Sequence, residues 1–226
     1  MNVMRQKVRL LTAAAAFVIS SASTAQAQLI TSFGALNPPV TTITDFGLHN
    51  TSVSSGHSAT IGGSSNVLMN YTGGSGLYFD YCGWGLGDNG STCGNSLGIN
   101  QAGLLRFSFN NGPVSGVGIM LNYAPPYGNT FIRARDSFNN ILAEYEMSAS
   151  APISGNAYAF RGIQFNTANI ASFELEGTGG VSPIMESLSF TASPSTTVPE
   201  PGSVALVAAG LLGLGGFARR RKGQTA

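Results

Sequence analysis

The chain has 226 residues, of which 9% are charged, and a formal net charge of +1. This length allows one or two domains. The charges are unevenly distributed, because residues 28–197 contain four arginines and no lysine against nine carboxylates, a formal charge of −5. A domain of this charge lacks the basic surface that binds a phosphate backbone, so the sequence argues against nucleic-acid binding.

Residues 1–27 have the three parts of a secretory signal peptide. Basic residues at positions 5, 7 and 9 precede a short apolar run that ends at Ile19, and the small-residue box Ala25-Gln26-Ala27 follows. We therefore expect export through the Sec translocon and cleavage by signal peptidase before Gln28. The alternative is a buried N-terminal helix.

Residues 28–190 are long enough for one domain with a sizeable core. They contain short apolar or alternating runs separated by Gly, Asn, Ser and Pro, without a long segment of helical period. The runs are residues 40–44, 66–71, 104–109, 117–123, 131–135, 141–147, 157–160, 171–176 and 186–190. Many short strands at regular spacing favour an all-β fold, a single β-sandwich that we expect to be jelly-roll-like. Residues 191–197 are small, uncharged and contain proline, as is typical of a linker.

One hairpin is predicted in detail. Residues 131–135 and 141–147 alternate on either side of a turn rich in Asp and Asn. Arginines 133 and 135 would then face Glu144 and Glu146 across the two strands. We interpret these charges as stabilising rather than functional.

The two cysteines, Cys82 and Cys93, are separated by ten residues. In an exported chain such a pair predicts a disulfide, which would contribute roughly 3 kcal/mol in the chain-entropy model. Two free thiols are the alternative. Two cysteines cannot build a cysteine-rich zinc site, and no metal site is predicted from the histidines.

The loop between these cysteines is the candidate ligand site. It contains the single tryptophan, Trp84, among glycines, followed by Asp88 and Asn89. An aromatic face can stack on a sugar ring, and the two polar side chains can bind hydroxyl groups or ligate Ca²⁺. The alternative is a surface loop whose Trp84 packs onto the sandwich. No cofactor is predicted beyond this option of calcium.

Catalysis is poorly supported by the sequence. Glu174 and Glu176 are a carboxylate pair that could flank a glycosidic bond, but on one strand face such a pair more often forms a solvated surface. We expect a protein that is not an enzyme, with a hydrolase of matrix polysaccharide as the alternative.

The C-terminal residues 198–223 combine a Pro-Glu-Pro motif, a short apolar run and a basic cluster. Residues 203–218 are uncharged, but they fall short of the roughly 20 apolar residues of an ordinary membrane span. The basic residues after them would remain on the cytoplasmic side. The motif is formed by Val198, Pro199, Glu200 and Pro201, and the cluster by Arg219, Arg220, Arg221 and Lys222.

This three-part tail resembles the PEP-CTERM sorting signal of Gram-negative bacteria, a tail also described as an ice-binding protein C-terminal domain. The resemblance implies recognition of Pro199-Glu200-Pro201 by the membrane protease exosortase. It also implies a transient inner-membrane stage held by the apolar helix, followed by release or attachment at the cell surface in organisms that make extracellular polysaccharide and biofilm. A permanent membrane anchor is the alternative.

Together, these features predict an exported cell-surface or extracellular-matrix protein with a structural or adhesive role. Polysaccharide binding through the Trp84 loop is one option for the ectodomain. The ligand of residues 28–190 is not determined by the sequence.

Overall fold

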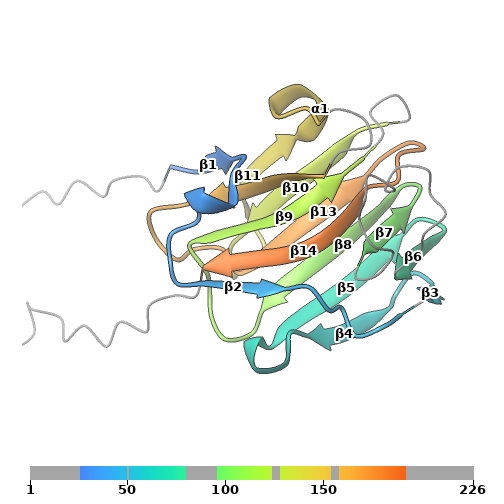
Figure 1. The fold of residues 1–226 in the computed structure, drawn as a ribbon, viewed down its shortest axis with the longest axis horizontal. Coiled ribbons are helices and arrows are strands. Elements are labelled where there is room, and N and C mark those ends of the chain that lie inside the picture. The colour runs from blue at the N-terminus through green and yellow to red at the C-terminus, as the bar shows by residue number, and fades with distance from the viewer. Residues whose placement is uncertain (1–25, 50, 80–95, 124–127, 154–157, 192–226) are drawn as a thin grey trace, which may run out of the picture.

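The structure is a computed structural model that describes residues 26–49, 51–79, 96–123, 128–153 and 158–191. Within these residues almost all regular structure is β-strand (Figure 1). The helical pieces are short: η1 (Phe33–Ala35), η2 (Gly63–Ser65) and α1 (Met147–Ser150). The all-β fold predicted from the sequence is therefore confirmed, whereas the signal peptide and the apolar C-terminal run lie outside the described residues.

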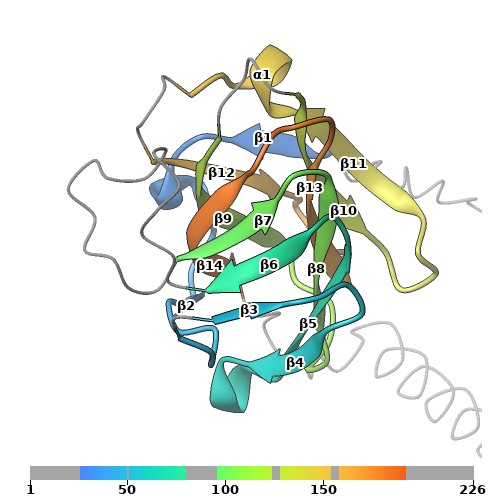
Figure 2. The same cartoon turned by 90° about the vertical axis from the view of Figure 1, so that its right-hand side faces the viewer.

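Two sheets pack face to face, and every strand pairing in the described part of the chain is antiparallel. Figure 2 shows the two layers from one end. Sheet A has the order β1 (Gln28–Ile30), β12 (Ala159–Gln164), β9 (Gly116–Asn122), β14 (Ile184–Thr191), β7 (Leu97–Asn100), β6 (Gly76–Phe79) and β3 (Thr51–Val53), with β2 (Val40–Ile43) also paired to β14. Sheet B has the order β11 (Ile141–Glu146), β10 (Thr130–Arg135), β13 (Ser172–Gly177), β8 (Gly103–Phe109), β5 (Val67–Gly73) and β4 (Ser58–Ile61).

The eight strands from β7 to β14 have the strand order of a jelly roll. They form the four-strand orders β7-β14-β9-β12 in sheet A and β8-β13-β10-β11 in sheet B. Successive strands cross between the sheets except at the β10–β11 hairpin, which gives the two nested Greek keys of this topology. The six strands that precede β7 extend both sheets.

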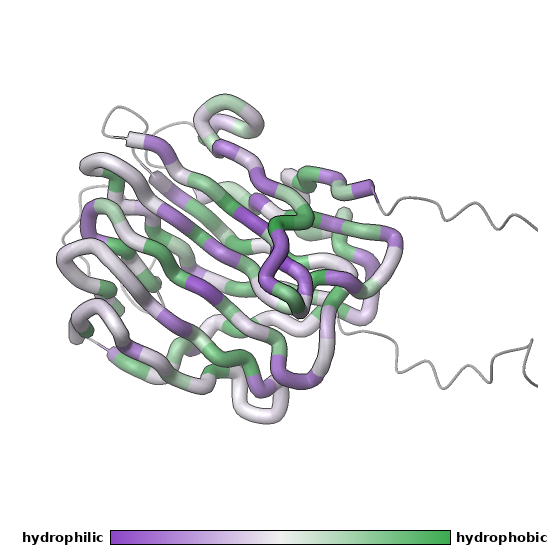
Figure 3. The backbone as a smooth tube through the Cα atoms, turned by 180° about the vertical axis from the view of Figure 1, so that it is seen from behind, coloured by the Kyte–Doolittle hydropathy of each residue, from purple (hydrophilic) through white to green (hydrophobic). Residues whose placement is uncertain are grey.

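Side-chain alternation explains why these segments become strands. In β8 the residues Leu105, Phe107 and Phe109 are buried, while the residues between them are only half-buried. Figure 3 shows the same alternation of hydrophilic and hydrophobic residues along neighbouring strands. The inward side chains of both sheets form one core, and each large one that is fully buried contributes roughly 1.5–3 kcal/mol to folding.

The β10–β11 hairpin is present as predicted, but its charge pairing differs from the expectation. Arg133 lies opposite Glu144, as the alternation predicts. A bulge between Ala134 and Arg135 shifts the register, so that Arg135 lies opposite Ile141. Glu146 lies opposite Phe131, so the expectation that Arg135 also faces a glutamate of β11 is wrong. Because the two strands are antiparallel, the register that sets Arg133 opposite Glu144 places Arg135 at the turn end of β11.

One end of the sandwich carries both ends of the described chain (Figure 1). Gln28 of β1 pairs with Gln164, which in turn pairs with Gly116. The backbone N–H of Gly116 donates a hydrogen bond to Thr191, the last described residue. We call this end, where β8 and β14 finish and β2 and β9 begin, the tail end.

Candidate functional site

The candidate ligand residues from the sequence fall outside the part of the chain that the structure describes. These are Trp84, Asp88 and Asn89, together with the cysteines Cys82 and Cys93. The sorting motif and the basic cluster lie outside it as well. The predicted disulfide, the sugar-stacking role of Trp84 and the calcium option therefore stay predictions.

The described residues contain neither a metal cluster nor a membrane-spanning helix. No group of three or more His, Cys, Asp or Glu side chains in them is placed to hold a metal ion. Among the described helices, none is both long and apolar enough to cross a membrane.

A pocket of about 320 Å³ lies at the tail end. It is formed where β2, η2, the β8–β9 connection and the end of β14 meet. This tail-end pocket is lined by Thr41, Ser64, Ser65, Phe109, Asn111, Gly112, Val114 and Phe190. Its volume is at the lower end of the range that small-molecule sites occupy in proteins.

Two aromatic rings form the apolar part of this pocket. Phe109 ends β8 in sheet B and Phe190 lies near the end of β14 in sheet A, so the two sheets each supply one ring. The ring centroids are 5.0 Å apart with an interplanar angle of 47°. Thr41 lies beside Phe190 because the two residues are paired in register. The aromatic pair is thus held by the ladders of both sheets.

Amide side chains fix the polar rim of the pocket. Asn111 donates hydrogen bonds from Nδ2 to the carbonyl oxygens of Ser64 and Ser65, at 3.0 and 3.2 Å. The neighbouring Asn110 donates from its own Nδ2 to Oδ1 of Asn66 at 3.3 Å. These contacts tie the β8–β9 connection to η2, two segments more than 40 residues apart in the sequence. The rim is therefore preorganised rather than formed by one loop on its own.

The side chains that line the tail-end pocket carry no charge. Its lining offers two hydroxymethyl groups, one threonine hydroxyl, one carboxamide and two phenyl rings, with no ionisable side chain. Such a lining can contact the apolar face of a ring through the phenylalanines and exchange hydrogen bonds with hydroxyl groups at the rim. It has no group that would attract a strongly charged ligand or take part in acid–base chemistry.

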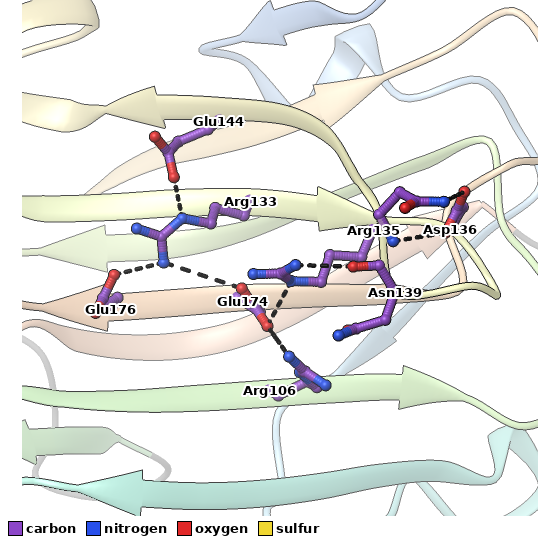
Figure 4. A network of polar contacts seen from close by, with 9 residues as sticks. Arg106, Arg133, Arg135, Asp136, Asn139, Glu144, Glu174 and Glu176 are labelled. Carbon is purple, nitrogen blue, oxygen red and sulfur yellow. Dashed lines mark hydrogen bonds and ion pairs between the residues drawn. The ribbon is translucent and has the colours of Figure 1, made fainter.

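The second polar feature of the described residues is a charge cluster on the outer face of sheet B (Figure 4). Three guanidinium groups converge there on Glu174, whose side chain is 0% exposed. Arg106 donates from Nε to Oε1 of Glu174 at 2.7 Å, and Arg135 approaches the same oxygen at 2.9 Å. Arg133 is 3.9 Å from the second oxygen and forms ion pairs with Glu144 and Glu176.

The carboxylates of this cluster are paired with arginines. Burial lowers the pKa of Arg133, but its hydrogen bonds to Glu144 and Glu176 outweigh that effect and raise the pKa. The carboxylates of Glu174 and Glu176 are both engaged in ion pairs with guanidinium groups. His57 precedes β4, three strands from β13 in sheet B, about 14 Å away at ordinary strand spacing. His57 is therefore not adjacent to the carboxylate pair of Glu174 and Glu176.

The tail-end pocket has only weak signals in the sequence. The runs Gly62-Gly63-Ser64-Ser65 and Asn110-Asn111-Gly112-Pro113 are typical of turns, and nothing in them distinguishes a binding rim from a connection. Their approach to each other depends on the strand order of the sandwich. Phe109 and Phe190 look like ordinary inward residues of two strands.

Comparison with known proteins decides the nature of the tail. Residues 197–222 match the PEP-CTERM protein-sorting motif. The chain carries a PEP-CTERM sorting motif. This motif marks a protein for export to the cell envelope or surface, with exosortase as its processing partner. The resemblance noted in the sequence is thereby confirmed at nearly the same residues.

The solved structures that resemble this PEP-CTERM chain do so distantly. A mutant of the lectin binding domain of lectinolysin complexed with Lewis b has 11% sequence identity and a TM-score of 0.30, over 44% of this chain and 72% of that one. The lectin domain of lectinolysin complexed with Lewis B antigen has 11% identity and a TM-score of 0.31, with the same coverage.

A third structure, an exo-1,3/1,4-beta-glucanase from a Pseudoalteromonas species, has 13% identity and a TM-score of 0.25, over 62% of this chain and 17% of that one. Similarity at this level carries no inference about ligand or activity. No curated protein matches the sequence of the chain.

Proposed function

We propose that this exported PEP-CTERM protein is a non-enzymatic component of the cell surface or extracellular matrix, and that its β-sandwich binds uncharged polysaccharide in the tail-end pocket. The observation that carries the proposal is the pocket itself, with two phenyl rings and a rim of hydroxyl and amide groups. The predicted Trp84 loop is a second place where the same ligand could bind.

The uncharged lining supports a neutral ligand. A polysaccharide that carries carboxylates would need cationic partners, and the lining residues supply none. Neutral sugars offer apolar ring faces and many hydroxyl groups, which match the two kinds of surface in the pocket. The preorganised rim supports binding further, because little loop ordering is needed when the ligand enters.

The sorting motif supports a defined order of events. The chain would pass through the Sec translocon, lose residues 1–27 to signal peptidase, and be held briefly in the inner membrane by the apolar run of residues 203–218. Exosortase would then cleave near Pro199-Glu200-Pro201 and release or attach the ectodomain at the cell surface. A permanent membrane anchor is the alternative to this step.

Sugar binding is tested on an array of neutral and acidic oligosaccharides. Ser64 is exposed at the rim, so Ser64→Trp would occlude the pocket without disturbing the core. Ser150→Trp places the same side chain on α1, away from the tail end, and serves as the matched control. We expect Ser64→Trp to abolish binding to neutral glycans and Ser150→Trp to preserve it.

The same array separates the two candidate binding places. Loss of binding in Trp84→Ala with full binding in Ser64→Trp would move the site to the predicted loop and reject the pocket. An absence of binding to every glycan by the unmodified protein would reject the polysaccharide-binding function altogether.

Processing is tested by mass spectrometry of the C-terminus of the mature protein. We expect peptides from residues 219–226 to be missing from surface material and to be present when exosortase is deleted. Their presence in mature surface protein would favour the permanent anchor.

A further inference from the structure

Phe138, at the tip of the β10–β11 hairpin, is the most exposed large hydrophobic side chain in the described part of the molecule. Its exposed fraction is 84%, and that of Ile141, at the start of β11, is 50%. A third exposed residue, Phe33, differs because its ring packs edge-on against Phe160 at 5.8 Å. Phe138 and Ile141 together form an apolar hairpin tip.

The turn that presents Phe138 is held by its own hydrogen bonds. Asp136 accepts hydrogen bonds at Oδ1 from the backbone N–H groups of Phe138 and Asn140, at 2.9 and 2.8 Å. Its Oδ2 accepts a third from the side chain of Asn140 at 2.9 Å. Arg135 donates to the carbonyl oxygen of Asn139 at 2.9 Å. The exposure of Phe138 is thus a property of a well-defined turn.

A chain of contacts places the hairpin tip at the tail end. The carbonyl oxygen of Arg135, the last residue of β10, accepts a hydrogen bond from the N–H of Ala171 at 2.8 Å. The carbonyl oxygen of Ala171 accepts one from Phe109 at 3.0 Å, and Phe109 contacts Phe190 beside the last residue of β14. The hairpin therefore turns at the end from which the chain continues toward the sorting motif.

The chain between the sandwich and the motif is short. Thr191 ends β14 and the sorting motif begins at residue 197, six residues later. Six residues span about 20 Å when fully extended. The apolar run begins at residue 203, twelve residues after Thr191, so while residues 203–218 are in the bilayer the tail end stays within about 40 Å of the membrane surface.

The described connections at the tail end contain almost no charge. They comprise residues 36–40, 61–66, 109–116, 136–140 and 165–171, and Asp136 is the one ionisable side chain among them. Its carboxylate already accepts the three hydrogen bonds of the turn. This end can approach anionic headgroups without strong repulsion, because other carboxylates are absent from these five segments.

We propose that, in the membrane-held precursor, Phe138 and Ile141 insert into the headgroup–acyl boundary of the bilayer and hold the tail end of the sandwich against the membrane. The inference rests on the transient membrane stage of the proposed function and is independent of sugar binding. Aromatic and aliphatic side chains at this depth bury apolar surface, while the polar turn backbone stays hydrated. This contact keeps the sorting motif near the bilayer surface, where a membrane protease can reach it.

The test is photo-crosslinking of the full-length precursor in vesicles of phosphatidylethanolamine and phosphatidylglycerol. A p-benzoylphenylalanine replaces Phe138 in one variant, Ser150 of α1 in a second, and Leu212 of the apolar run in a third. We expect lipid adducts at positions 138 and 212 and none at 150. The thermal unfolding temperature of each variant is compared with that of the unmodified protein, to verify that the variant keeps the same fold.

Each outcome tests a separate step of the proposal. Lipid adducts at 212 without adducts at 138 would overturn the hairpin contact and leave the membrane stage intact. Adducts at neither position would overturn the membrane stage itself. Protein adducts in place of lipid adducts at 138, with exosortase present, would overturn the lipid contact and assign the hairpin tip to the protease.

Discussion

Glu174 offers the sharpest test of the charge cluster on sheet B, through the substitution Glu174→Gln. The side chain is 0% exposed and forms ion pairs with three arginines, whose own side chains are 15–32% exposed. The substitution keeps the volume of the side chain but removes the shared counterion of three guanidinium groups. Removing one partner of a buried ion pair costs about 3–5 kcal/mol, and the partial exposure of the arginines places the expected loss at about 3 kcal/mol.

The assay is urea and thermal unfolding of the purified protein, with Glu144→Gln as the matched control. A loss of about 3 kcal/mol lowers the unfolding temperature by roughly 6–12 °C in a domain of this size. Glu144 is 43% exposed and pairs with Arg133, so Glu144→Gln should cost less than about 1 kcal/mol. The difference should persist in 1 M salt, since salt screens exposed pairs most strongly. Equal losses in the two variants would refute the assignment of Glu174 as the centre of the cluster.

Three further predictions concern packing and pH. Gly118→Ala should destabilise the protein by about 1–3 kcal/mol in urea unfolding, because the new Cβ would overlap the Phe160 ring; unchanged stability would contradict this packing. Burial raises the pKa of Tyr71, so its contribution to stability is full below its unfolded pKa of about 10 and is lost as pH rises. The free energy of unfolding should therefore decrease less steeply with rising pH in Tyr71→Phe than in the unmodified protein. An equal decrease in the two proteins would contradict this role of Tyr71. The side-chain hydrogen bond from Asn140 is the main cause that lowers the pKa of Asp136, so the stability it contributes above its unfolded pKa of about 3.9 is lost as pH falls. The free energy of unfolding should therefore fall less steeply with decreasing pH in Asp136→Ala than in the unmodified protein. An equal fall in the two proteins would exclude this role of Asp136.

The long strands of the sandwich could be predicted because their side chains alternate over enough residues to identify a strand. Each of the nine runs found in the sequence overlaps a strand of the structure, closely in β8, β9 and β10 and only at residues 159 and 160 for the run 157–160. The strands that sequence reasoning missed are β1, β3, β4, β6 and β7, each of three or four residues. In so short a segment alternation carries little information, and these strands are defined by their pairing with neighbouring strands in the two sheets.

The partners of charged residues could be predicted only where they are local. Arg133 and Glu144 lie in one hairpin, and their pairing follows from alternation alone. Glu174 lies on β13, and its register against β10 is set by the jelly-roll order rather than by any nearby turn. Arg135 lies opposite Ser172 in the same regular register, two residues from Glu174 on β13, so its ion pair with Glu174 also follows from this long-range register.

The tail-end pocket depends on the same non-local geometry. Its rim joins η2 to the β8–β9 connection through Asn111, and its rings come from one strand in each sheet. Each of these pieces has an ordinary structural role when considered alone: a turn, a connection or an inward strand position. Only the closure of the two sheets makes them neighbours, so the pocket is a property of the topology.

The position of the pocket constrains how the proposed function could operate. Phe190 is one residue from the end of β14, and the sorting motif begins six residues after Thr191. If exosortase cleaves near Pro199 and leaves the ectodomain attached at its new C-terminus, the end of β14 beside the pocket lies within about 30 Å of the attachment point, the reach of eight extended residues. The opposite end, which carries α1, then faces away from the cell. A polysaccharide bound at the base of the molecule would be held against the cell surface, which favours a role in retaining matrix over one in reaching distant partners. A released ectodomain would lose this geometry while keeping its affinity, so cell-bound polysaccharide should fall on removal of residues 197–222 even though the secreted domain still binds the same glycan.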